Sequence, residues 1–199
     1  MTPQERFQKV ILFVGATVYY LGGYFFLNYW SFQRGVFHDL TLPGEAMVPF
    51  VPQLIFGYLV NYPMIIWVYL RVQDLSYFKR CAFAFSVCVT VHLAIFFFFP
   101  VRYNLRPVIN PDASWLMAMI DFYYWLDLPY NCFPSLHVSN AFLVYLLLRR
   151  YGYREAPLFL GLSILLMVVV VLIKQHYILD SLAAIPVAFF SLWVAFRDK

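Results

Sequence analysis

The sequence predicts an all-α polytopic membrane protein, in which residues 1–199 form a single domain with six transmembrane helices. Three observations lead to this class. The chain is 63% hydrophobic, it is only 12% charged, and its mean hydropathy is +0.72, outside the range of soluble domains. Its apolar residues also form runs close to the ~20 residues that cross a bilayer. Because the bilayer core offers no water to bond free backbone groups, these runs are expected to be helices.

The first three apolar runs cover residues 10–30, 49–70 and 81–99. The first has a spanning length and lacks the small-residue cleavage pattern of a signal peptide, so it is expected to remain as a helix. Within it, the pair Gly22-Gly23 suggests close packing against another helix, in the same chain or in a second copy.

The last three apolar runs cover residues 136–150, 157–174 and 178–196, and the first two of these are short for a span. Residues 100–135 form a long connection before them, where Asp112, Asp121 and Asp127 alternate with tryptophan, tyrosine and phenylalanine. This composition predicts an interfacial helix between spans three and four, at the level of the lipid headgroups. The same segment can also serve as a wall or lid over a site.

The basic residues predict the orientation of the spans. If the N-terminus is cytoplasmic, ten of the 14 basic residues fall on the cytoplasmic side and four on the other, which is a positive-inside bias. Both termini are then cytoplasmic, and the segments 31–48, 100–135 and 174–178 face the periplasm or lumen. The cytoplasmic set is Arg6, Lys9, Arg71, Lys79, Arg80, Arg149, Arg150, Arg154, Arg197 and Lys199, and the outer set is Arg34, Arg102, Arg106 and Lys174.

Composition also argues against two other classes of protein. The net charge of +4 is spread in small groups between apolar runs, which is not the pattern of a nucleic-acid-binding surface. The cysteines Cys81, Cys88 and Cys132 form no paired framework, so no disulfide is expected.

The stretch KQHYILD places a histidine and a carboxylate at the outer end of an apolar run. His176 and Asp180 are four residues apart, so on one helix their side chains would share a face. Asp180 can then hold one ring nitrogen of His176 as N–H and leave the other free as a nucleophile or base. Carboxylates inside a membrane segment are functional candidates.

The stretch NCFPSLH supplies a second set of polar groups on the same face. Pro134 suits the first turn of a helix, whose free backbone N–H groups attract anions, and Ser135 can add a hydroxyl donor. His137 can give a proton to a leaving oxygen. Fixed positive charge for a phosphate is predicted from outer cations, which are Arg102, Arg106 and Lys174.

These motifs resemble those of the type 2 phosphatidic acid phosphatase superfamily, in the order PSLH and then KQHYILD. The resemblance implies a six-helix fold with an outward active site and no metal or other cofactor. It implies that His176 forms a phosphohistidine, that Asp180 orients it, that His137 protonates the leaving group and that Ser135 binds phosphate. The Pro-Ser-Leu-His and His-Tyr-x-x-Asp wording is closest to the inositol phosphorylceramide and sphingomyelin synthase branch.

Four positions, spread over the three motifs, depart from the phosphatase pattern of that superfamily. Leu136 replaces a glycine in the second motif, and Val169 and Val170 replace Ser-Arg in the third. The first motif keeps Arg106-Pro107, but its expected lysine falls on Phe99. Arg102 and Lys174 are therefore predicted to substitute for the missing cations.

The predicted function is a membrane lipid phosphoesterase or phosphotransferase acting on a phospholipid or sphingolipid. If the acceptor is a lipid or polyol hydroxyl, the protein is a transferase, and if the acceptor is water, it is a hydrolase. The sequences of the two histidine motifs favour the transferase. Two other hypotheses stay open at this point: a non-enzymatic lipid-binding or transport protein, and a metal site built from His137, His176 and Asp180. His92, in the third run, is interpreted as a hydrogen-bonding residue between helices.

Overall fold

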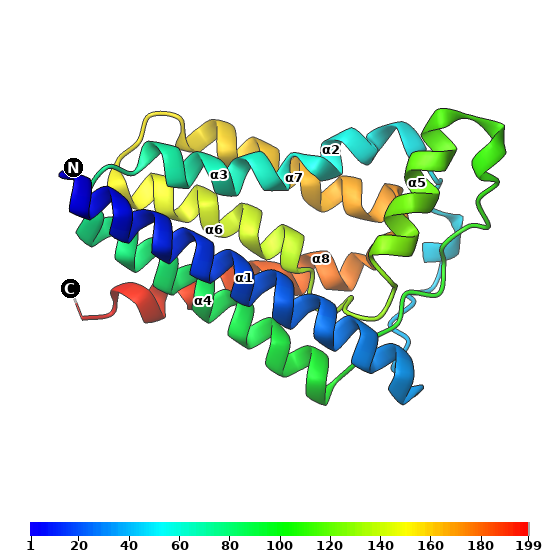
Figure 1. Ribbon diagram of the computed structural model, residues 1–199. Coiled ribbons are helices and arrows are strands. Elements are labelled where there is room, and N and C mark those ends of the chain that lie inside the picture. Colours follow the sequence, from blue (N-terminus) through cyan, green and yellow to red (C-terminus); the bar gives the residue numbers. More distant parts are fainter. Residues whose placement is uncertain (199) are drawn as a thin grey trace.

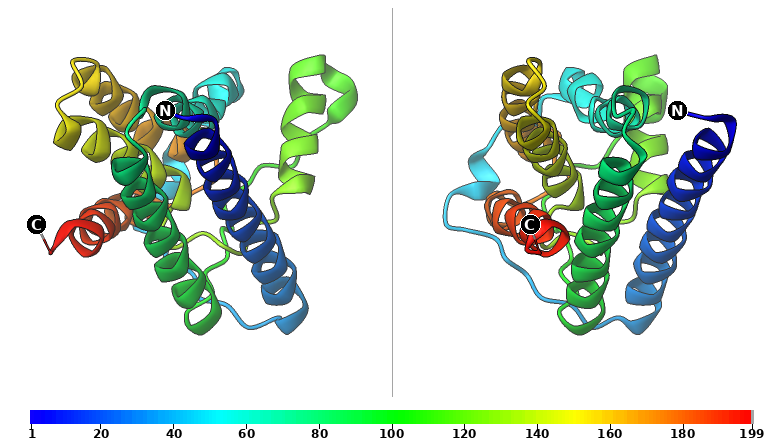
Figure 2. Two further views of the ribbon diagram at one scale, coloured as in Figure 1. Left: turned by 60° about the vertical axis from the view of Figure 1, so that its left-hand side comes forward. Right: turned by 90° about the vertical axis from the view of Figure 1, so that its left-hand side faces the viewer.

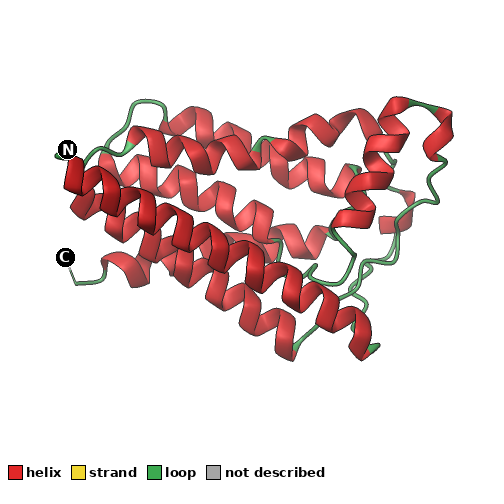
Figure 3. Ribbon diagram, viewed as in Figure 1, coloured by secondary structure: helices red, strands yellow, loops and turns green. Residues whose placement is uncertain are grey.

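A computed structural model describes residues 1–198 of the chain, and Lys199, one of the predicted cytoplasmic cations, lies outside the described residues. The described part is helical and contains no strand (Figure 3). Two isolated β-bridges join His38 to Val101 and Val101 to Asn131 in the loops. The all-α class predicted from composition is confirmed.

Helices α1 (Pro3–Arg34) and α4 (Leu75–Phe98) pack along each other (Figure 2). Both extend beyond the predicted runs because polar caps close their ends: Thr2 and Glu5 form a capping box at α1, and Asp74 accepts the Tyr77 N–H at α4. A Cβ added to Gly23 would lie 2.5 Å from Leu93 Cδ1. The close helix contact predicted at this glycine pair is therefore made inside the chain.

The second apolar run forms a broken helix rather than one rod. It consists of the 3₁₀ turn η2 (Pro52–Leu54), α2 (Ile55–Leu59) and α3 (Asn61–Arg71). Pro63 follows the break at Val60, and proline cannot donate a backbone hydrogen bond to the preceding turn. Beyond the break, on the side away from the termini, α2 presents Tyr58 to the interior.

Helix α6 (Leu136–Tyr151) occupies the centre of the bundle (Figure 1). Every residue from Leu136 to Leu148 is buried, because α3, α4, α7 (Ala156–Leu172) and α8 (Ile178–Phe196) pack around it. Its C-terminus is closed by Gly152 in the left-handed conformation, with φ of 85°.

Four stretches in the described part are long and apolar enough to cross a membrane: α1, the η2–α3 stretch, α4 and α8. Helix α7 is apolar but has 17 residues, and α6 has 16. Helix α1 begins and α8 ends at the same end of the bundle (Figure 1). Six crossings with cytoplasmic termini remain a prediction.

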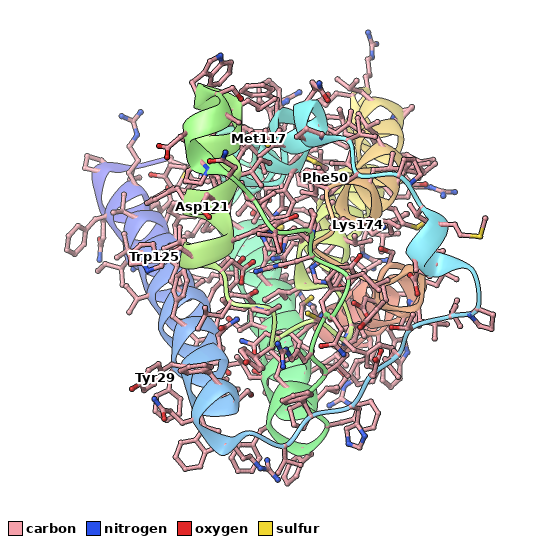
Figure 4. All side chains as sticks on the ribbon, turned by 90° about the vertical axis from the view of Figure 1, so that its right-hand side faces the viewer. Tyr29, Phe50, Met117, Asp121, Trp125 and Lys174 are labelled. Carbon is pink, nitrogen blue, oxygen red and sulfur yellow. The ribbon has the colours of Figure 1, made fainter. Side chains whose placement is uncertain are left out.

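The long connection between α4 and α6 contains the 3₁₀ turn η3 (Pro111–Ala113) and α5 (Trp115–Leu126). Helix α5 lies across the end of the bundle that is opposite the termini, and Figure 4 looks onto this end. Trp115 and Trp125 are exposed, and Ile120 is its one buried residue. A helix at the predicted place is confirmed, whereas its position in the headgroup layer remains a prediction.

Candidate active site

The loop between α7 and α8 carries His176, and its side chain is held by two oxygen atoms. Its Nδ1 lies 3.0 Å from the Cys132 carbonyl and 3.3 Å from Asp180 Oδ2. A carbonyl oxygen can only accept, so Nδ1 carries the hydrogen and Nε2 keeps its lone pair. This is the tautomer that a nucleophilic histidine needs.

Asp180 does not share a helix with His176, contrary to the sequence prediction. Helix α8 starts at Ile178 with Tyr177 as its N-cap, so His176 precedes the helix and Asp180 is the third helical residue. The two side chains meet because Asp180 turns back toward the helix start, where its Oδ2 also accepts the Tyr177 N–H at 2.8 Å. The other oxygen, Oδ1, is buried without a hydrogen-bond partner among the described residues.

Ser135 is the N-cap of α6, and Pro134 therefore lies before the helix rather than in its first turn, which corrects the prediction. The Ser135 hydroxyl accepts the Val138 N–H at 3.4 Å, and the Ser135 N–H donates to the Asp180 carbonyl at 3.0 Å. The second bond joins the two sequence motifs directly. A capping hydroxyl can still donate its own hydrogen to an anion.

His137 faces His176 across the space between these two motifs. The centroids of their rings are 6.1 Å apart, and both side chains are buried. The two predicted histidines, Asp180 and Ser135 are therefore brought together from segments about 40 residues apart in the sequence. His92 lies in α4, between the Cys88 carbonyl and the Ser139 hydroxyl, as expected for a packing residue.

Arg106 is the predicted cation with the most contacts near His176. Its guanidinium donates to the side-chain oxygen of Gln175, the neighbour of His176, and to the Tyr124 carbonyl at 3.2 Å. It also lies 4.4 Å from the centroid of the Tyr124 ring. Its Nε and the Gln175 Nε2 are buried N–H donors without a protein partner in the described part.

Arg102 and Lys174 lie close to the loop but make different contacts. The Arg102 guanidinium is 5.0 Å from the centroid of the Phe37 ring, and within residues 1–198 it makes no hydrogen bond to His137 or His176. Lys174 is nearly buried, and it has a φ of 57°, a conformation unusual for a residue other than glycine. Figure 4 shows Lys174 on the face that α5 borders. Strained residues of this kind gather at functional sites.

A network of polar side chains fixes the loop that carries Tyr177 to the outer segments. The Tyr177 hydroxyl donates to Asp39 Oδ1 at 2.9 Å and accepts the Asn104 N–H at 3.0 Å. Hydrogen bonds from Thr41, Asn104 and Tyr177 lower the pKa of Asp39 to about 2. Burial raises the pKa of Tyr177 to about 12, so its hydroxyl stays protonated and able to donate.

Helix α5 contacts the segment just before His176, and its role as a wall or lid over a site stays a prediction. The Tyr124 hydroxyl donates to the Ile173 carbonyl at 2.8 Å, two residues before Gln175. Arg106 lies between Tyr124 and Gln175 and so connects the same two elements.

Sequence reasoning missed several residues around the site. Glu45, in the turn η1 (Glu45–Met47), is buried and accepts the Ile178 N–H at 2.6 Å, which caps α8. Tyr58 contacts His137 and Gln175 contacts Arg106, whereas Asp127 contacts Tyr58 and reaches His137 only through it. Of these, Asp127 carried a signal in the sequence as a carboxylate among aromatic residues, and Gln175 lies within the stretch KQHYILD without having been singled out. Glu45 and Tyr58 lie in segments without a recognisable motif.

One group in the described part has the spacing of metal ligands. It consists of Cys132, His176 and Asp180, whose potential ligand atoms lie within 4.8 Å of one another. His137, expected in the metal hypothesis, is not part of this group. Burial raises the pKa of the Cys132 thiol, so a metal ion would have to displace the thiol proton on binding.

Two helix starts, a histidine held by a carboxylate and a facing histidine together make a site suited to phosphate chemistry. No curated protein and no solved structure matches the chain. A family model described as the PAP2 superfamily matches residues 51–194, from the turn before α2 to the last turn of α8. This match covers most of the chain and both histidine motifs, and the chain therefore belongs to the PAP2 superfamily.

Proposed function

We propose that the protein is a membrane lipid phosphoesterase or phosphotransferase that works through a phosphohistidine at His176. The observation that carries this proposal is the position of His176, whose Nδ1–H is engaged by Cys132 and Asp180 while Nε2 is free. Membership of the PAP2 superfamily suggests lipid phosphatase or phosphotransferase chemistry. The facing ring of His137, 6.1 Å away between centroids, supplies the second group that such chemistry needs.

In the first step, Nε2 of His176 attacks phosphorus and the bond from phosphorus to the leaving oxygen breaks. His137 gives its proton to that oxygen, and the imidazolium that forms on His176 is stabilised by the Asp180 carboxylate. In the second step, an acceptor hydroxyl gives its proton to His137 and attacks phosphorus, and the bond to Nε2 breaks. His137 is thereby returned to its acid form.

The oxygens of the phosphate would be held by the start of α6 and by nearby cations. The first backbone N–H groups of α6 and the Ser135 hydroxyl provide donors. Arg106 Nε and the neighbouring Gln175 Nε2 are N–H donors without a hydrogen-bond partner in the described part of the protein. Lys174 and Arg102 add positive charge at the outer end of the bundle, as the sequence predicts.

The acceptor decides between transfer and hydrolysis. We favour transfer to a lipid or polyol hydroxyl, because Pro-Ser-Leu-His resembles the inositol phosphorylceramide and sphingomyelin synthase branch. Leu136 itself is buried in the helix-packing core, so this preference rests on the motif and not on a contact to the phosphate. Phospholipids and sphingolipids are the substrate classes, and the second candidate is a plain lipid phosphate phosphatase.

The test is to incubate the purified protein in mixed micelles with phosphorus-labelled phospholipids, with and without alcohol acceptors, and to identify the products. A new labelled lipid indicates transfer, and free phosphate indicates hydrolysis. Acid-labile label on the protein, present in wild type and absent in His176→Ala, is expected for a phosphohistidine. Undiminished turnover by His176→Ala would overturn the mechanism.

A chelator separates this proposal from metal catalysis. We expect full turnover in EDTA, because every step is assigned to a side chain. Loss of turnover in EDTA, restored by a divalent ion, would favour the group of Cys132, His176 and Asp180 as a metal site. Movement of lipid across the membrane without any chemical product would favour the transport hypothesis.

A further inference from the structure

His137 has one hydrogen-bond partner among the described residues, and this partner is a tyrosine that the catalytic motifs do not include. The Tyr58 hydroxyl lies 2.9 Å from His137 Nε2 and 3.4 Å from Nδ1. The two rings are 4.6 Å apart between centroids. Tyr58 is only 1% exposed, so water does not compete for this contact.

The contact continues from Tyr58 to the carboxylate at the end of α5. Asp127 Oδ2 lies 3.4 Å from the Tyr58 hydroxyl, while Oδ1 accepts from the Tyr24 hydroxyl at 2.6 Å and from Asn28 at 3.4 Å. Asp127 is thus fixed by α1 and by α2 at the same time. A chain of hydrogen bonds runs from His137 through Tyr58 to a carboxylate.

A tyrosine hydroxyl suits a histidine that must both give and take a proton, because it can donate and accept. When Nε2 of His137 carries hydrogen, it can donate to Tyr58, whose own hydrogen then points to Asp127. When Nε2 has only a lone pair, the Tyr58 hydroxyl can turn and donate to it. Asp127 keeps an acceptor available in the first state and stabilises the positive charge of a protonated His137.

We propose that Asp127, acting through Tyr58, is a positioning residue that holds His137 in place during both of its proton transfers. This inference rests on the proposed function. Each histidine then has its own carboxylate: Asp180 contacts His176 directly, and Asp127 reaches His137 through one hydroxyl. The carboxylate noticed in the sequence among aromatic residues thereby gains a role.

The experiment compares Tyr58→Phe and Asp127→Asn with matched controls. Tyr62→Phe removes a hydroxyl from a ring that also faces His137, at 6.2 Å between centroids, without a hydrogen bond to it. Asp121→Asn removes a carboxylate from the exposed side of α5 (Figure 4). Thermal unfolding of each variant shows whether the bundle is intact.

We expect Tyr58→Phe and Asp127→Asn each to lower kcat about 10-fold to 100-fold and to change KM less than about 2-fold. This loss is smaller than the loss on removing an acid–base residue itself, because His137 is still present. The controls should keep wild-type kcat. In Asp127→Asn, the pH above which activity declines should move lower, because a protonated His137 loses its nearby negative charge. The other titratable groups around His137 are Tyr58, Tyr62, His92 and His176, and the variant leaves them unchanged.

The double variant Tyr58→Phe/Asp127→Asn tests whether the two residues act through one chain. Its loss in kcat should equal the larger single loss, because the first change already breaks the connection. Three results would overturn this inference: a kcat loss in the double variant equal to the product of the two single losses, an unchanged pH profile in Asp127→Asn, or an equal kcat loss in Tyr62→Phe. Wild-type turnover would still support the proposed function in each of these cases. A wild-type protein without turnover would overturn both.

Discussion

The carboxylate of Asp180 lies 3.3 Å from Nδ1 of His176 although the histidine is in a loop and the aspartate is in a helix. The same oxygen accepts the Tyr177 N–H at the start of α8. One carboxylate therefore both begins a helix and orients the proposed nucleophile. Different substitutions at Asp180 should therefore separate its contribution to stability from its contribution to turnover.

Asp180→Asn should reduce turnover strongly while the protein stays folded. The amide can still accept the Tyr177 N–H, but it carries no charge to stabilise a positive His176, so kcat should fall about 10²-fold to 10⁴-fold. Asp180→Ala should show the same loss and also lower the free energy of unfolding by about 1 kcal/mol, because the cap is lost. Phosphate release and thermal unfolding measure the two effects. Near-wild-type kcat in Asp180→Asn would contradict the orienting role.

Ser135 allows the capping role of a hydroxyl to be separated from its role toward phosphate. Ser135→Ala should lower the free energy of unfolding by about 1 kcal/mol. Ser135→Gly should lower it by only roughly a few tenths of a kcal/mol, because glycine is an acceptable N-cap. Both variants lack the hydroxyl and should lose turnover equally. If Ser135→Gly instead keeps both the stability and the turnover of wild type while Ser135→Ala loses both, the hydroxyl only caps α6.

Asp39 should make stability fall in strong acid. Its pKa is about 2 in the folded protein against a usual value of 3.8, so the unfolded chain binds the proton more readily. The stabilisation is complete above the usual value and is lost as the pH falls through about 2. The Tm difference between wild type and Asp39→Asn should be constant near neutral pH and shrink toward pH 2. Asp112→Asn, an exposed carboxylate in the same outer region, serves as control.

Labelling of introduced cysteines tests the predicted orientation and the crossings of the third and fourth apolar runs. The native cysteines are all buried, so they should give little background. In sealed vesicles with the outer face exposed, an impermeant thiol reagent should label Val108→Cys, and it should label Gln73→Cys and Arg154→Cys only after permeabilisation. Val108 and Arg154 lie on either side of α6 in the sequence. Labelling of Arg154→Cys in intact vesicles would show that α6 does not cross.

The sequence was informative where one local pattern determined the structure. Apolar runs predicted the helices. The charge bias, which assigned both histidine motifs to one side of the membrane, and the family resemblance led us to expect His137 and His176 in one site. Helix ends were less accurate. Helix α1 extends to Pro3 and Arg34 because capping and charged residues continue it beyond the apolar run. The break at Pro63 could have been expected from proline alone.

Contacts between distant segments could not be read from the sequence. Tyr58 and Asp127 are 69 residues apart, and nothing in either segment indicates that α5 ends beside α2. The aspartate and histidine of KQHYILD were expected on one helix, because spacing alone cannot show that Tyr177 starts α8. The pairing of Arg106 with Gln175 likewise depends on how the long outer segment folds back.

The enclosure of α6 has a consequence for how the enzyme responds to its membrane. Because residues Leu136–Leu148 are covered by neighbouring helices, the helix that carries His137 is insulated from the lipid. Changes in bilayer thickness act on the helices that contact lipid, which can tilt to adjust. The spacing of the two histidines should therefore be largely independent of lipid composition, whereas the access of a substrate from the bilayer should depend on it.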